Sequence, residues 1–149
     1  MIEVWSGFRE GNERGGAGQA RTGKGGERAV ARVLVVDDDP SILDTVTSIL
    51  ENEGHQVMAA GGGEEALSLA RAWHPTLVLL DMRMPIMDGW AVAKSLRDSG
   101  SRVPIVVMTA AENARGWADE IGAAGHLDKP FGLDELIAVV ERHSGTKQN

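Results

Sequence analysis

Residues 33–38 (VLVVDD) and residues 77–81 (LVLLD) decide the fold of this chain. Each stretch is a short run of Val and Leu that ends in aspartate, and a third run, residues 105–109 (IVVMT), ends in threonine. Continuous apolar runs of this length are typical of strands buried on both faces of a parallel sheet. Because ligands of open α/β sheets bind at the carboxyl ends of the strands, the pattern predicts one polar site there.

Helical patterns separate these runs. Asp39 followed by Pro40 is typical of a helix start, with Asp as the N-cap and Pro in the first turn. Further helices are expected over residues 64–73, 89–98 and 113–124 and from residue 133, with further strands at residues 56–60 and from residue 125. Five strand–helix units in a row predict an α/β fold, a doubly wound (βα)5 parallel sheet with right-handed crossovers.

The chain divides into three segments by composition. Residues 1–30 hold eight of the 19 glycines, lack a helix or strand period and carry a net charge of +1. We expect them to form a flexible arm, since they offer little apolar surface to offset the entropy of ordering. Residues 31–143 are expected to form the single domain, and residues 144–149 a polar tail.

Composition also limits the classes of function. The chain has no cysteine, so disulfides and thiolate metal sites are excluded. Its formal charge of −7 argues against direct binding to nucleic acid. Apolar stretches of membrane-spanning length and a signal peptide are both lacking in the sequence, so we expect a cytoplasmic protein that does not contact the membrane.

The predicted site contains three carboxylates, a hydroxyl and an amine. Asp37, Asp38 and Asp81 repel one another, and a hard divalent cation such as Mg²⁺ would relieve that repulsion. Cation and acids together suit a phosphoryl group, for which an aspartate can be the nucleophile. Thr109 would donate a hydrogen bond to the phosphoryl group and Lys129 would supply positive charge. The bond from Lys129 to Pro130 is a candidate cis peptide, which would turn the lysine over the crevice.

Four motifs resemble the receiver domain of response regulators in two-component signalling. They are VLVVDDDP (33–40), LVLLDMRMPIMDGW (77–90), IVVMTA (105–110) and HLDKPF (126–131). The motifs occur in the family's order and spacing, and the resemblance covers nearly the whole chain outside the arm. It implies a flavodoxin-like fold with strand order 2-1-3-4-5.

The resemblance also implies a role for each site residue. Asp81 would be the phosphoacceptor. Asp38 would ligate Mg²⁺ directly and Asp37 mainly through water, and the backbone carbonyl of Arg83 would be a further ligand. The phosphoryl group would be contacted by Thr109, Ala110 and Lys129.

One position departs from the family's common pattern. The switch residue three places before the lysine is often Tyr or Phe in the family, and here it is His126. We expect either that His126 rotates inward when Thr109 moves, or that it is a partly exposed surface histidine. These two interpretations carry equal weight from the sequence.

The resemblance implies signalling through partners rather than enzymatic turnover. We expect a stand-alone response regulator without an output domain, phosphorylated by a histidine kinase or phosphotransfer protein and acting on an unknown protein target. A phosphorelay intermediate is the alternative. A haloacid-dehalogenase-type phosphatase is a weaker alternative, because Asp37-Asp38-Asp39 mimics its DxD motif while residues 84–89 (MPIMDG) stay unexplained.

Overall fold

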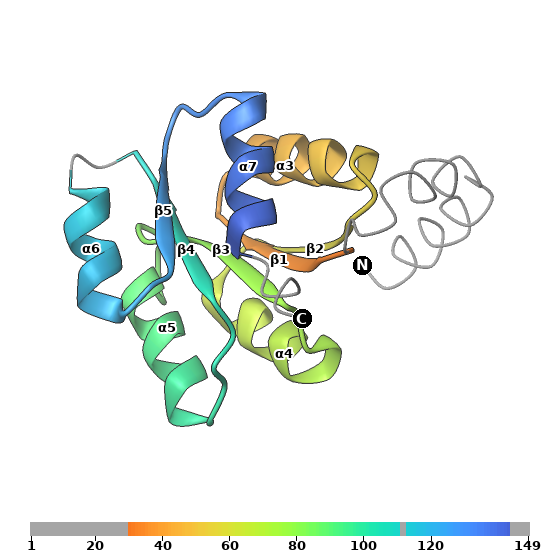
Figure 1. Ribbon diagram of the computed structural model, residues 1–149. Coiled ribbons are helices and arrows are strands. Elements are labelled where there is room, and N and C mark those ends of the chain that lie inside the picture. The colour runs from red at the N-terminus through yellow and green to blue at the C-terminus, as the bar shows by residue number, and fades with distance from the viewer. Residues whose placement is uncertain (1–29, 111–112, 144–149) are drawn as a thin grey trace. The chain divides into compact units, whose positions relative to one another are not determined.

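The computed structural model describes residues 30–110 and 113–143. Residues 1–29 of the predicted arm, residues 111–112 and the predicted tail lie outside these ranges. The described chain alternates strands and helices from Arg32 onward (Figure 1). The elements are β1 (Arg32–Val36), α3 (Pro40–Asn52), β2 (Gln56–Ala60), α4 (Gly63–Trp73), β3 (Leu77–Asp81), α5 (Gly89–Asp98), β4 (Ile105–Thr109), α6 (Ala114–Ile121), β5 (Gly125–Asp128) and α7 (Leu133–His143).

The five strands form one parallel sheet in the order β2-β1-β3-β4-β5, which confirms the predicted fold class and strand order. All residues of β3 and β4 are buried, as their continuous apolar runs predict. In Figure 1, α3 and α7 cover one face of the sheet, while α4 and α5 lie on the other. The structure is therefore the doubly wound type, with both faces covered by helices.

The core beneath α3 and α7 follows the alternation of side chains along the strands. Val33 and Val35 of β1 and Leu79 of β3 point to the same face as Leu50 of α3 and Leu136 of α7, and all five are 0% exposed. Every second strand residue thus packs under one helical layer and the intervening residues under the other. This double burial holds the strand ends, and the residues that follow them, in fixed positions.

The start of α3 and the end of α6 can be compared with the helix boundaries predicted from the sequence. Asp39 caps α3 as predicted, since its side chain accepts a hydrogen bond of 2.9 Å from the Ser41 N–H. The fourth helix was predicted to run to Ala124, which is wrong, because α6 ends at Ile121. Gly122 adopts φ 68, in the left-handed region, and its N–H bonds to carbonyls of the last turn. Ala124 instead donates to the Ile105 carbonyl beside β4.

Candidate functional site

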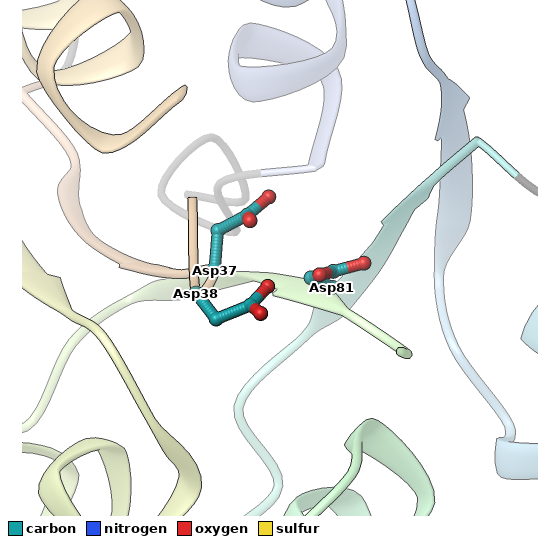
Figure 2. A group of neighbouring side chains, drawn as sticks. All are labelled: Asp37, Asp38 and Asp81. Atoms are coloured by element: carbon teal, nitrogen blue, oxygen red, sulfur yellow. The ribbon is translucent and has the colours of Figure 1, made fainter. Parts of the chain in front are cut away.

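Strand register brings the predicted acids together. Val36 of β1 pairs with Leu80 of β3, so that the residues that follow, Asp37 and Asp81, lie side by side at the carboxyl edge of the sheet. Figure 2 shows Asp37, Asp38 and Asp81 gathered at these two strand ends. One carboxylate oxygen from each lies within 4.8 Å of the others. The structure thus assembles the three carboxylates that the sequence predicts.

Burial differs sharply among the acids. Asp37 is 0% exposed and Asp81 is 4% exposed, whereas Asp38 is exposed to solvent. The Asp37 carboxylate accepts a hydrogen bond of 2.9 Å from the Asp39 N–H, and Asp81 accepts one of 3.4 Å from the Arg83 N–H. Asp38 is therefore the acid most open to an incoming cation, while the two buried acids are held by backbone donors.

Lys129 links the far edge of the site to the acids. Its Nζ lies 2.6 Å from Asp37 Oδ2 and 3.8 Å from Asp81 Oδ1, and its backbone N–H donates to the Thr109 carbonyl. The Lys129–Pro130 peptide bond is cis. The lysine ammonium is thus the one cation of the described residues that is paired with these buried carboxylates.

Asp81 has a perturbed pKa. Desolvation by burial is the largest cause, and the negative charge of Asp37 adds to it; together they raise the pKa of Asp81 to about 6. Lys129 and the Arg83 N–H oppose the shift. A carboxyl group that is costly to ionise gains from any added positive charge, and oxygen-only donors of this kind fit Mg²⁺.

The remaining predicted residues lie at the ends of β4 and β5. Thr109 is 1% exposed at the last position of β4, and Ala110 follows it at the exposed rim. His126 lies on the edge strand β5 with a side chain that is 36% exposed, and its Nδ1 is 3.1 Å from Asp128 Oδ1. In this structure His126 therefore occupies a surface position, and its proposed inward rotation stays a prediction.

The structure also brings together a group that sequence reasoning missed. The guanidinium of Arg83 lies 5.6 Å from the centre of the Trp117 ring. The rings of Trp117 and Trp90 meet edge to face at 4.8 Å. This aromatic pair lies at the contact between α5 and α6. Nothing in the spacing of these residues signals the contact with Arg83.

Asp39 does not join the carboxylate group. Its side chain caps α3, and hydrogen bonds from the Ser41 side chain and backbone lower its pKa. The triplet Asp37-Asp38-Asp39 therefore divides into two residues in the crevice and one cap. This division removes the second aspartate that the phosphatase interpretation of a DxD motif requires.

The chain belongs to the response-regulator receiver family. The family model described as "Response regulator receiver domain" matches residues 33–141. The chain is similar to response regulator MprA of Mycolicibacterium vanbaalenii, with 40% identity over 72% of this chain and 47% of that protein. It is also similar to the DNA-binding response regulator MtrA of Mycolicibacterium smegmatis, with 44% identity over 73% of this chain and 48% of that protein. The chain thus spans about half the length of these relatives.

Solved structures agree with this assignment. Chemotaxis protein CheY4 of Vibrio cholerae matches with a TM-score of 0.72 and 32% identity, over 77% of this chain and 99% of that one. The receiver domain of Francisella response regulator 1452 matches with a TM-score of 0.71 and 30% identity, over 76% and 96% of the respective chains. Within residues 30–110 and 113–143, none of the helices has the length and apolar character that crossing a membrane requires.

Proposed function

We propose that this receiver domain accepts a phosphoryl group on Asp81 from a histidine kinase or phosphotransfer protein and signals through a protein partner. The observation that carries the proposal is the placement of Lys129 Nζ beside both buried acids, 2.6 Å from Asp37 and 3.8 Å from Asp81. Positive charge there favours the ionised, nucleophilic form of Asp81 and suits the oxygens of an incoming phosphoryl group.

Asp38, Asp37 and Asp81 would hold Mg²⁺, and the backbone carbonyl of Arg83 would complete the protein ligands. The metal would supply charge neutralisation for the phosphoryl oxygens. Three mutually close carboxylates, one of them exposed, support this assignment. In the reaction, an Asp81 oxygen attacks phosphorus, the bond from phosphorus to the donor's nitrogen breaks, and Thr109, Ala110 and Lys129 contact the transferred group.

The domain is proposed to catalyse only its own phosphorylation and dephosphorylation. It would not turn over a separate substrate. A cytoplasmic location belongs to the same proposal. So does signalling without direct contact to nucleic acid, which the net charge of −7 supports. Thr109 and His126 are proposed to relay the phosphorylation state to the partner. Loss of the partner's preference for the phosphorylated form in His126→Ala would support that relay, and an unchanged preference would exclude His126.

The proposal is tested by mass spectrometry of the intact protein. With acetyl phosphate and Mg²⁺, the wild type is expected to gain the mass of one phosphoryl group, and Asp81→Asn is expected to gain none. Asp128→Asn, which changes an exposed aspartate at the end of β5, is the matched control and should label normally. Undiminished labelling of Asp81→Asn would overturn the assignment. Transfer from a panel of purified histidine kinases would then identify the donor.

A further inference from the structure

Arg83 joins the phosphoacceptor strand to α6. Its backbone N–H donates to Asp81 Oδ1 at 3.4 Å, while its guanidinium lies 5.6 Å from the centre of the Trp117 ring. Trp117 belongs to α6, which follows β4 rather than β3. One residue therefore contacts the phosphoacceptor through its backbone and a distant helix through its side chain.

The indole that faces Arg83 is itself held in place. Trp90, in the first turn of α5, meets Trp117 edge to face with ring centres 4.8 Å apart and an interplanar angle of 65°. Trp90 Nε1 also donates a hydrogen bond of 2.8 Å to Glu120 Oε1, and Glu120 lies on α6 with Trp117. Two contacts thus fix the aromatic surface on which the Arg83 guanidinium rests.

The electrostatic environment of Arg83 would change when Asp81 is phosphorylated. Arg83 is exposed, and the ion pairs found in residues 30–110 and 113–143 do not include it. A phosphoryl group on Asp81 adds negative charge and acceptor oxygens two residues from Arg83. A guanidinium binds such oxygens through charge-assisted, often bidentate hydrogen bonds, which are stronger than a solvent-exposed cation–π contact.

We propose that Trp117 is a positioning residue that holds the Arg83 guanidinium outside the crevice until a phosphoryl group on Asp81 draws it away. This inference rests on the proposed function, since it needs phosphorylation of Asp81. The exchange uncovers one face of the Trp117 indole and so couples the phosphorylation state to α6. This coupling uses neither Thr109 nor His126.

The test is a double-mutant cycle on the binding of beryllofluoride, a phosphoryl mimic, to the full chain with Mg²⁺, followed by the backbone amide NMR signal of Asp81. Arg83→Ala is expected to weaken binding several-fold. Trp117→Leu is expected to strengthen binding about two- to fivefold, because Arg83 no longer has to leave the indole. In the Arg83→Ala background, Trp117→Leu should have no effect.

Two further variants keep the test decisive. Trp117→Phe retains an aromatic side chain against Trp90 but weakens the cation–π contact, so it should give a smaller gain that Arg83→Ala abolishes. Trp73→Leu removes the other described arginine–tryptophan contact, in which Arg32 lies 5.1 Å from the Trp73 ring centre, and should leave beryllofluoride binding unchanged.

The outcomes separate this inference from the proposed function. A wild-type protein that does not bind beryllofluoride would overturn the proposed function. If the wild type binds beryllofluoride normally, two results would overturn only the role of Trp117. One is that neither Trp117→Leu nor Trp117→Phe gains affinity. The other is that the gain in affinity persists in the Arg83→Ala background.

Discussion

Asp81 carries an unfavourable charge at neutral pH. Its pKa is raised to about 6, first by burial and then by Asp37, so ionising it in the folded protein costs free energy. In the proposed function this cost has a use. Burial and the charge of Asp37 disfavour the empty, ionised site, so they would favour the binding of a cation and the addition of a phosphoryl group contacted by Lys129.

The pH dependence of stability follows from this shift. The folded-state pKa lies above the ordinary value of 3.8, so ionisation favours the unfolded state. The cost is absent below about pH 4, where both states are protonated, grows between about pH 4 and 6, and is complete above about pH 6. In chelator at neutral pH, Asp81→Asn is therefore expected to raise the free energy of unfolding by about 1–3 kcal/mol.

Urea denaturation at pH 7.5 and pH 4 measures this effect. The stabilisation by Asp81→Asn should appear at pH 7.5 and vanish at pH 4. Asp44→Asn, on the exposed side of α3, is the control and should change little at either pH. Equal stabilisation by Asp81→Asn at both pH values would show that the cost of ionising Asp81 is not its cause.

Asp38 is the residue at which the proposed metal binding can be tested. It is the exposed member of the carboxylate group. We expect this group to bind Mg²⁺ weakly, because it offers the metal only a few protein ligands. Asp38→Ala is expected to lose Mg²⁺ binding in calorimetry and labelling by acetyl phosphate, while Asp44→Ala keeps both. Normal labelling of Asp38→Ala in the presence of a chelator would contradict the assignment of the metal ligands.

At the scale of elements, the start of α5 sits directly against the end of β3. A Cβ atom on Gly89 would lie 2.6 Å from the Met82 Cα and 2.8 Å from the Asp81 carbonyl oxygen, both of them backbone atoms. Asp88 caps this helix by accepting a hydrogen bond of 3.0 Å from the Ala91 N–H. The position of the Asp81 backbone therefore depends on how closely α5 can approach.

Gly89→Ala tests this close approach. The added methyl group must displace backbone, so we expect a loss of about 1–3 kcal/mol in the free energy of unfolding and slower labelling of Asp81. Gly61→Ala is the matched control, because a Cβ there meets nothing within 4 Å. Urea denaturation and the rate of labelling measure both effects. A Gly89→Ala protein with wild-type stability would contradict the close approach.

At the scale of the whole molecule, the described core forms from residues at and after Ala31. Ala31 is itself 0% exposed, and its N–H donates to His55 Nδ1 at 3.0 Å. A deletion that tests residues 1–29 should therefore leave Val30 and Ala31 in place. The glycine content of the deleted segment predicts that it adds little to the stability of the domain.

Deleting residues 1–29 is expected to shift the melting temperature by no more than a few degrees, the range for a change of about 1 kcal/mol in a domain of this size. Differential scanning calorimetry of the deletion and the full chain measures the shift. A much larger loss of stability would mean that residues 1–29 contribute to the domain. His55→Ala, which removes the acceptor for Ala31, should destabilise more than the deletion does.

Much of the fold and the site could be predicted because the signals are local. Continuous runs of Val, Ile and Leu specify buried strands, and the residues directly after them must lie at one edge of a parallel sheet. This is why the positions of Asp37, Asp38, Asp81 and Thr109 at that edge could be predicted without a structure. The end of α6 was misplaced because Ala123 and Ala124 continue the helical pattern beyond Gly122, whose left-handed conformation stops the helix.

Other features arise only when distant segments pack. Asp37 and Lys129 are far apart in the sequence, and their 2.6 Å contact depends on the order of four strands. The Arg83–Trp117 contact depends on how α6 packs beside α5, and no periodicity encodes it. The exposed position of His126, beside buried Leu127 on the edge strand β5, likewise depends on which side of that strand the helices cover. Residue type and spacing determined which polar groups gather at the strand ends, whereas packing decided which charges meet, because side-chain contacts depend on angstrom-scale placement.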